Sequence, residues 1–328
     1  MLHHRIVFLA LTGLLLGSCA APATPRQAPA ASRATVPHPP ARPTGLPAFS
    51  HVFVVVMENL GYRAALGVPQ LASLAGRWAV ATRYYAVAHP SLPNYLALTS
   101  GGTQGVTSDC WFCYRKADNL GEELSDRGIS WGAYMEGLPK AGWLGPWWPP
   151  GDYAGKHDPF RYYTDIRDSR SLRAHLQPLH QLTKRLSGPA SGVPRFVWVT
   201  PNLCNDGHDC PPARAAAWLS GFVRQVTASA AWRHGGVLFV TWDEGNGADP
   251  RGVAGIRVLA HGGGGHVFTL VIAPGLPRDL RVSVPYSHYS LLKTVEEAWG
   301  VPLLGQTASP AVQDMAAFWG KLRTGGGR

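Results

Sequence analysis

The sequence predicts an α/β fold, with a mostly parallel central sheet flanked by helices on both faces. Short apolar segments rich in β-branched and aromatic residues recur from residue 51 onward, and each has the length of a strand. Helical patterns stand between several of these segments, as in folds with a parallel sheet. The first segment, HVFVVVM, is apolar almost without interruption, which is typical of a strand covered on both faces.

The elements follow in chain order. The expected strands are HVFVVVM at 51–57, ISWGAYM at 129–135, RFVWVTP at 195–201, GVLFVTW at 236–242 and VFTLVIAP at 267–274. Helices are expected at 68–78, 94–101, 213–232 and 286–300. The stretch 140–163 has three tryptophans and several prolines, and we expect a long ordered loop there, since loops of that length are usually functional.

The chain opens with a targeting signal. Arg5 precedes the apolar stretch 6–16, which is too short to span a bilayer and fits a signal peptide at 1–18. The small residues before Cys19 resemble the lipobox of bacterial lipoproteins, in which the cysteine is lipidated. An ordinary cleaved secretory signal is the alternative. In both cases the protein is expected to be secreted, and in the first it is lipid-anchored to the cell envelope through Cys19.

The composition of the remaining chain limits its domain organisation and the partners that it can bind. Residues 19–48 are dominated by Ala, Pro, Thr and Arg and are expected to form a disordered spacer, and 323–328 a flexible tail. The 328 residues are 45% hydrophobic and 15% charged, which suits one large folded domain at 49–322. The net charge is +10, but its cations form no long run, so a nucleic-acid partner is not expected. The excess suits attraction of anionic substrates.

Four cysteines follow Cys19, an even number in an oxidising compartment. We expect the disulfides Cys110–Cys113 and Cys204–Cys210, because each pair brackets a short loop. A metal site is the alternative, but a single CxxC beside a wider pair is a weak zinc signal.

Two of the expected strands end in polar pairs. The strand 51–57 runs into Glu58-Asn59, and 236–242 runs into Asp243-Glu244. Ligands of open parallel sheets bind outside the carboxyl ends of the strands. A turn at Gly61 or Gly245 would let both members of each pair face one point. Three carboxylates and an amide oxygen suit a divalent cation, whereas solvated strand ends explain either pair taken alone.

The segment HPSLPNYLALTSGG at 89–102 places Ser91 just before an expected helix, with Pro93 in the first turn. An N-cap is a sufficient reason for a serine at this point. The functional interpretation is that the helix N-terminus and a metal activate Ser91 as a nucleophile and favour a bound phosphate.

The ordered motifs VVVMEN, HPSLPNY, NDGHDC, TWDEG and YSHYSLL resemble the phosphoesterase family of secreted bacterial and fungal acid phosphatases and phospholipases C, which is related in fold to alkaline phosphatase. The resemblance covers roughly residues 50–303. It implies an alkaline-phosphatase-like catalytic domain at 49–322. It also implies a metal-dependent phosphoesterase, foremost an acid phosphatase that hydrolyses phosphomonoesters through a phosphoserine intermediate.

The resemblance also implies the roles of individual residues. One divalent metal ion would be held by Glu58, Asn59, Ser91, Asp243 and Glu244, with Ser91 also the phosphoryl acceptor. Its identity stays open among calcium, magnesium, manganese and zinc. His157 and His208 match positions that contact the phosphate or protonate the leaving group, although His157 could equally be a surface loop residue. His288 matches a motif that a structural bond at a helix start explains equally well.

The expected partner is a small phosphoester substrate. The chain lacks the long inserts and C-terminal domains of the larger phospholipase members, which favours monoesters. A phospholipase C-type phosphodiesterase is the alternative, and a non-enzymatic, lipid-anchored surface binding protein is the alternative from a different class. The sequence does not predict the oligomeric state.

Overall fold

The computed structural model describes residues 45–247, 249–253 and 263–323. These residues belong to one compact unit, Ala41–Arg328. The expected signal peptide, most of the expected spacer and the last residues of the expected tail lie outside the described residues. Within the described part, no helix combines the length and the apolar character needed to cross a membrane.

The main sheet has its strands in the order β11-β2-β10-β9-β1-β8-β4-β7. All neighbouring strands run parallel except β10, which is antiparallel to both β9 and β2. The mostly parallel sheet is therefore confirmed. The strand bounds, in sheet order, are Arg281–Val282, Ala79–Ala81, Leu270–Ile272, Gly236–Trp242, His51–Met57, Phe196–Thr200, Trp131–Met135 and Leu176–Pro178.

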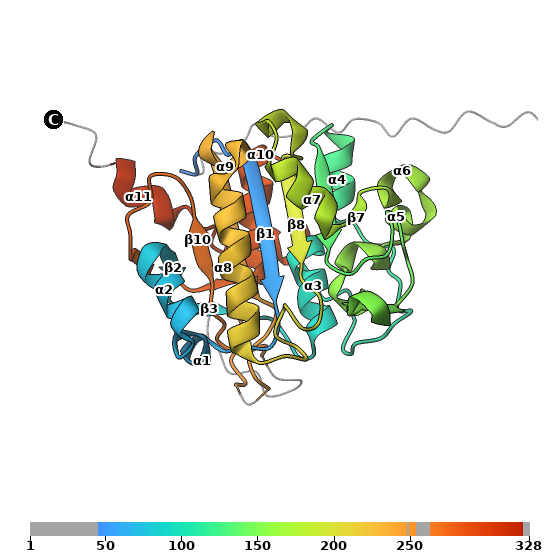
Figure 1. Cartoon of the computed structure of the whole chain (residues 1–328), viewed down its shortest axis with the longest axis horizontal. Coiled ribbons are helices and arrows are strands. Elements are labelled where there is room, and N and C mark those ends of the chain that lie inside the picture. The colour runs from blue at the N-terminus through green and yellow to red at the C-terminus, as the bar shows by residue number, and fades with distance from the viewer. Residues whose placement is uncertain (1–44, 248, 254–262, 324–328) are drawn as a thin grey trace, which may run out of the picture. The chain divides into compact units, whose positions relative to one another are not determined.

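Helices cover both faces of this sheet. Figure 1 shows α8 and α7 in front of the sheet and α10 behind it, and α10 packs against α3. The helices are α1 Tyr62–Leu66, α2 Pro69–Arg77, α3 Ser91–Ser100, α4 Leu120–Asp126, α5 Thr164–Asp168, α6 Arg170–Arg173, α7 Leu179–Leu186, α8 Pro212–Ala228, α9 Ala230–Arg233, α10 His288–Trp299 and α11 Ala317–Arg323. Two small sheets pair β3 (Tyr84–Tyr85) with β12 (Tyr286–Ser287), and β5 (Trp147–Trp148) with β6 (Tyr153–Ala154).

Two expected elements differ from the structure. The helix expected at 213–232 is two helices, because the Ser229 side chain accepts from the Trp232 amide at 3.2 Å and caps a new helix, α9. The strand expected at 267–274 is the shorter β10, which runs antiparallel to β9.

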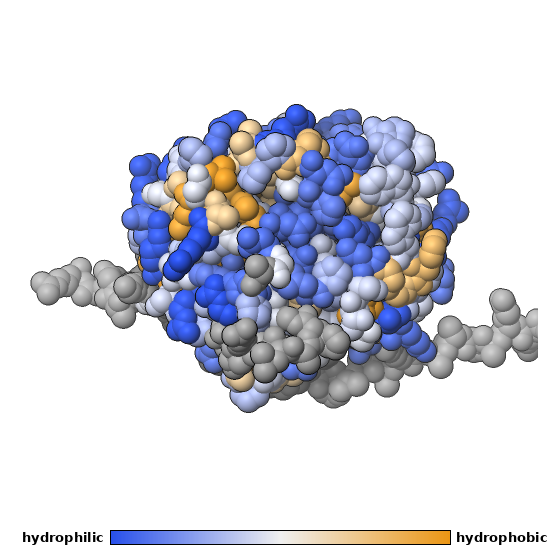
Figure 2. Space-filling model, turned by 90° about the horizontal axis from the view of Figure 1, so that it is seen from below, coloured by the Kyte–Doolittle hydropathy of each residue, from blue (hydrophilic) through white to orange (hydrophobic). Residues whose placement is uncertain are grey.

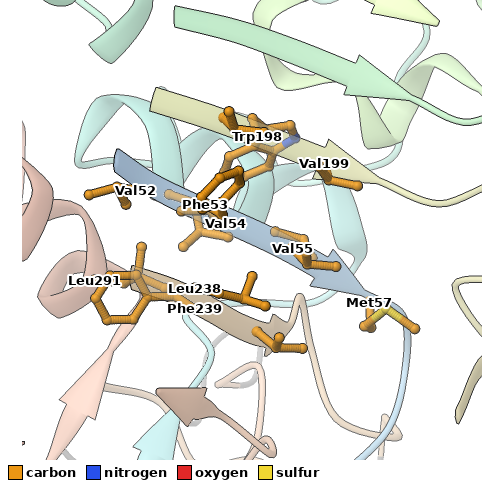
Figure 3. Packing of buried hydrophobic residues seen from close by; sticks show 14 of the residues in the cluster. Val52, Phe53, Val54, Val55, Met57, Trp198, Val199, Leu238, Phe239 and Leu291 are labelled. Atoms are coloured by element: carbon orange, nitrogen blue, oxygen red, sulfur yellow. The ribbon is translucent and has the colours of Figure 1, made fainter. Parts of the chain in front are cut away.

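The centre of the sheet is a dry apolar core. All seven residues of β1 are buried, and its side chains pack among those of β8, β9 and α10 (Figure 3). Each large apolar side chain buried in this way contributes roughly 1.5–3 kcal/mol. The register pairs Met57 of β1 with Trp242 of β9, so both strands end at the same level. Glu58 and Asp243 therefore leave the sheet side by side.

Both expected disulfides are present. Cys110 is bonded to Cys113, and Cys204 to Cys210. The stretch 140–163 is ordered and contains the β5–β6 hairpin and short 3₁₀ turns, including one at Gly155–His157.

Candidate active site

The two polar pairs meet beyond the carboxyl ends of β1 and β9. The Asn59 amide donates to Asp243 Oδ1 at 3.1 Å, which joins the two strand ends. Asn59 itself has a left-handed backbone, with φ 55°. Gly61 is extended, with φ −69°, so the prediction that Gly61 makes this turn is wrong. Figure 2 views the face that bears these strand ends; it is largely hydrophilic, and its hydrophobic areas lie away from the centre.

Ser91 is the first residue of α3 and is buried. Its hydroxyl donates to Glu58 Oε2 at 3.0 Å. The helix N-cap is Pro90, and the Leu92 amide is bound by the Asp109 carboxylate at 2.9 Å. The N-cap interpretation of Ser91 is therefore wrong: the helix starts one residue too early for it, and a distant aspartate accepts from the free amide. The hydroxyl is left to interact with the acidic cluster.

Glu58 is the centre of this cluster. Its Oε1 accepts from the Tyr95 hydroxyl at 2.6 Å, and its Oε2 accepts from the Asn59 side-chain amide at 3.2 Å. Burial raises the pKa of Glu58 well above its ordinary value, and the nearby charges of Asp243 and Asp206 raise it further. Burial likewise raises the pKa of Asp243. The charge of Glu244 raises this pKa further, and the hydrogen bond from the Asn59 amide lowers it.

His157 is buried between two carboxylates, so it is not a surface loop residue. Its Nε2 lies 3.2 Å from Glu58 Oε1, and its Nδ1 lies 3.2 Å from Asp206 Oδ2. Both are ion-pair distances without the alignment of a hydrogen bond. Burial lowers the pKa of His157 well below its ordinary value, and the charges of Lys156 and His208 lower it further. The imidazole is therefore neutral near pH 7.

His208 lies at the open side of the cluster. Its side chain is 30% exposed, its ring centre is 5.6 Å from that of His157, and its Nδ1 lies 2.6 Å from Asp209 Oδ1. The Cys204–Cys210 disulfide closes its loop. Its Nε2 lies 3.2 Å from the Lys156 ammonium, which donates to Asp109 at 2.7 Å.

Glu244 is adjacent to the cluster but has its own partner. Its Oε2 lies 2.7 Å from His89 Nδ1. That hydrogen bond raises the pKa of His89, against the opposing effect of burial. The structure thus joins Glu58, Asn59, Ser91 and Asp243 by direct hydrogen bonds and holds Glu244 against a histidine.

The cluster fits a cation. Asp243 Oδ2, His157 Nε2 and Asp206 Oδ2 are buried and have no hydrogen-bond partner among the described residues. Several carboxylates lie together with their pKa values raised by burial and mutual repulsion, an arrangement that a cation stabilises. Two donor sets share Glu58. One is the predicted oxygen set, and the other is Glu58, His157 and His208, whose ligand atoms all lie within 4.8 Å of one another.

This constellation of a buried serine, acidic strand ends and two histidines is accompanied by a match along most of the chain. The Phosphoesterase family model covers residues 50–302. The chain belongs to this family.

Named relatives of this phosphoesterase are phosphoric ester hydrolases, so the enzyme prediction is confirmed. The phosphatidylinositol-3-phosphatase of Mycobacterium tuberculosis is 33% identical over 84% of this chain and 85% of its own length. The phosphate-repressible acid phosphatase of Penicillium chrysogenum is 26% identical over 92% and 72%. Phospholipase C A of M. tuberculosis is 26% identical over 76% of this chain and 54% of its own length.

Solved structures confirm the fold class. A protein of the alkaline phosphatase superfamily from Vibrio parahaemolyticus aligns with a TM-score of 0.50 at 14% identity, over 80% of this phosphoesterase and 71% of that chain. Murine ectonucleotide pyrophosphatase/phosphodiesterase 5 aligns with a TM-score of 0.50 at 13% identity, over 79% and 97%.

Sequence reasoning missed several residues of the phosphoesterase site. Asp206 and His89 lie inside the NDGHDC and HPSLPNY motifs, so the motifs contained a usable signal for both. Tyr95 also lies inside HPSLPNY, whereas Asp109 and Lys156 lie outside the motifs and act through contacts with residues distant in the chain.

His288 holds the main chain of the site in place by hydrogen bonds. Because a carbonyl only accepts, its Nε2 donates to the Asp243 main-chain oxygen at 2.6 Å, and its Nδ1 accepts from the Tyr84 hydroxyl at 3.2 Å. Burial lowers the pKa of His288 to about 4, so it stays neutral in this role. The interpretation as a structural bond at a helix start agrees with its place as the first residue of α10.

Proposed function

We propose that this phosphoesterase is an acid phosphatase that hydrolyses phosphomonoesters through a phosphoserine formed on Ser91. The observation that carries the proposal is the position of the Ser91 hydroxyl, buried at the N-terminus of α3 and 3.0 Å from Glu58 Oε2. The dipole of a helix N-terminus favours a bound phosphate, although the Leu92 amide of this helix is already bound by Asp109.

The names of the relatives favour a phosphomonoester over a phosphodiester as the substrate. Two of those described above carry the word phosphatase in their names, and they are covered over more of their length than the phospholipase C is. The phosphatidylinositol phosphatase has a lipid substrate by name, so a lipid-borne monoester belongs to the candidate substrates together with small phosphoesters.

One divalent cation is part of the proposal. Glu58, Asn59, Ser91, Asp243 and Glu244 are its proposed ligands, and Asp243 Oδ2 has no protein hydrogen-bond partner among the described residues. When bound, the cation would supply positive charge that lowers the pKa of the serine hydroxyl and offsets charge on the phosphoryl oxygens. Oxygen donors favour calcium, magnesium or manganese, whereas a share taken by His157 or His208 would favour zinc.

The side chains perform the proton transfers. Ser91 Oγ forms the new bond to phosphorus while its proton passes to Glu58 Oε2, the atom that already accepts its hydrogen bond. The bond to the leaving oxygen breaks, and His208 gives that oxygen a proton. Water then attacks phosphorus and returns a proton to His208, while Ser91 leaves with the proton held by Glu58. His157 stays neutral beside Glu58, and the Tyr95 hydroxyl orients Glu58 by its hydrogen bond.

Replacing Ser91 with alanine tests this function. We expect hydrolysis of a nitrophenyl phosphate to fall by at least about a thousandfold, because the nucleophile is lost. Ser100→Ala is the matched control: Ser100 is buried in the same helix, but its hydroxyl donates to the Leu96 carbonyl, away from the cluster. Acid-quenched wild type should carry phosphate on the Ser91 peptide. A Ser91→Ala enzyme with more than about a tenth of wild-type activity would favour direct attack by water.

Localisation belongs to the same proposal. The signal peptide at 1–18 and the lipid on Cys19 would place the enzyme outside the cytoplasm, at the cell envelope. Radiolabelled palmitate should enter the wild type in a bacterial host and be absent from Cys19→Ala. Labelling of neither protein would favour the ordinary cleaved signal.

A further inference from the structure

Exposed aromatic side chains gather beside the site. Among the described residues, the exposed large hydrophobic side chains also include two isolated leucines, Leu66 and Leu303. The others are two adjacent pairs, Trp111-Phe112 and Trp147-Trp148, with exposed fractions between 37% and 68%. We call these four residues the aromatic rim. An exposed group of this kind is unusual on a soluble protein and marks a contact surface.

The aromatic rim is held in place. The Cys110–Cys113 disulfide closes the loop that presents Trp111 and Phe112. The guanidinium of Arg161, which is buried, donates to the Trp111 carbonyl at 3.1 Å and to the Leu144 carbonyl at 2.9 Å, so it ties this loop to the segment before β5. The rings of Trp111 and Trp147 stack with their centres 6.4 Å apart. The exposed rings are therefore positioned by the fold.

The rim borders the reaction site on both of its segments. Asp109, next to the disulfide loop, binds the amide of Leu92 in the first turn of α3 and also accepts from Lys156. The β5–β6 hairpin leads directly into the turn that carries Lys156 and His157. A large partner seated on the rim would lie against the entrance to Ser91.

We propose that the aromatic rim is a membrane-contact surface that seats the enzyme on an anionic phospholipid bilayer. Tryptophan rings favour the level of the lipid headgroups. The exposed tip continues from Trp148 through two prolines, which have no backbone N–H to remove from water. Lys140 is exposed and lies over the Trp143 ring, which packs edge-on against Trp148 of the rim. Lys116 and Asp118 are exposed in the segment after the disulfide loop, Asp152 is the acidic residue of the hairpin turn, and the whole chain carries +10. The proposal rests on the proposed function, since it assigns phosphorylated lipid headgroups as a substrate class.

Vesicle binding tests the proposal. The protein is the full chain carrying Cys19→Ala, so that a lipid on Cys19 cannot supply the binding. It is sedimented with sucrose-loaded vesicles of phosphatidylcholine containing phosphatidylglycerol. We expect binding to these vesicles, and a reduction of at least about tenfold in the partition coefficient for Trp147→Ala/Trp148→Ala. Leu66→Ala and Leu303→Ala are matched controls, because these leucines are exposed to the same degree, 37% and 39%. Both controls should bind like the parent.

Hydrolysis of a soluble nitrophenyl phosphate is measured on every variant. Unchanged soluble turnover with lost vesicle binding supports the membrane surface. If the parent protein binds vesicles but does not hydrolyse the nitrophenyl phosphate, the proposed function is overturned and the membrane-contact surface is retained. A parent that ignores vesicles, or a tryptophan variant that binds them fully, overturns the surface. If the tryptophan variant loses soluble turnover but keeps vesicle binding, the rim binds substrate instead. If the rim is needed for binding to a cell-wall polymer and not for binding to vesicles, it is a polymer-binding surface.

Discussion

Lys156 brings a positive charge to the edge of an acidic site. Its ammonium contacts Asp109 at 2.7 Å and lies 3.2 Å from His208 Nε2. The side chain is 19% exposed, so its charge is only partly screened by water. This charge would attract a phosphate to the site.

We expect Lys156→Met to weaken phosphate binding. The KM for a phosphomonoester and the inhibition constant of inorganic phosphate should rise together by about tenfold, which corresponds to about 1.4 kcal/mol. Lys140→Met is the control, because Lys140 is exposed and lies over the Trp143 ring. Steady-state kinetics with phosphate as inhibitor provide the measurement. An unchanged inhibition constant would assign Lys156 to the support of Asp109 alone.

At residue scale, the motifs predicted residues that the structure brings together, but they did not predict contacts between residues distant in the chain. Glu58, Ser91 and Asp243 were predicted; Ser91 donates to Glu58, and Asn59 links Glu58 to Asp243 by hydrogen bonds. The alternative explanation of Ser91 as an N-cap is wrong, because Pro90 is the N-cap and Asp109 accepts from the Leu92 amide. A pattern of neighbouring residues contains no information about such a contact.

Helix α10 contains a buried acid away from the site. Glu296 accepts from the Leu304 amide at 3.0 Å, and its Oε2 has no hydrogen-bond partner among the described residues. Burial raises the pKa of Glu296 from its ordinary 4.5 to about 8. Because the folded state holds the proton more tightly than the unfolded state, this acid favours folding most below pH 4.5 and loses that effect as the pH rises to about 8.

We therefore expect Glu296→Gln to flatten the stability profile. The wild type should lose stability, on the order of a few kcal/mol, between pH 5 and pH 8 relative to the glutamine variant, which has no proton to lose. Urea midpoints at the two pH values give the comparison. If the pH profiles of the two proteins run parallel, the raised pKa of Glu296 in the folded protein is contradicted.

The strands were predictable at element scale because long β-branched runs allow few other structures. The observed β1 and β9 match the expected 51–57 and 236–242 residue for residue. The direction of β10 was not predictable, since an apolar run has the same pattern in both directions. The division of the helix at Ser229 depends on one side-chain cap, which periodicity does not detect.

At the scale of the whole molecule, a bound cation would couple the site to stability. If Asp243 helps to hold it, a chelator should lower the melting temperature of the wild type and leave Asp243→Asn nearly unaffected. The variant His208→Ala distinguishes the oxygen set from the histidine set. If the oxygen set holds the cation, a chelator should still lower the melting temperature of this variant. If the histidine set holds it, the chelator should have no effect on that melting temperature. Differential scanning calorimetry with elemental analysis decides between them. A wild type that contains no metal and ignores chelator would contradict both sets.

Glu58 and Asp243 should also act as one unit. Removing either carboxylate should weaken metal binding, and removing both should add little, because a single site is already lost. Titration of the metal-free protein with a divalent ion measures this. Additive losses would indicate independent carboxylates that share no ion.

The position of β1 between β8 and β9 has a consequence for the time at which the enzyme becomes active. Asn59 and Asp243, which join the two strand ends, are 184 residues apart in the chain. During synthesis β1 is made early, and it remains without its second neighbour until β9 emerges after β8, so this pairing is slow to form. A chain interrupted before residue 236 would expose the apolar edge of β1 and lack half of the acidic cluster. Hydrolytic activity should therefore arise only after most of the protein has been made.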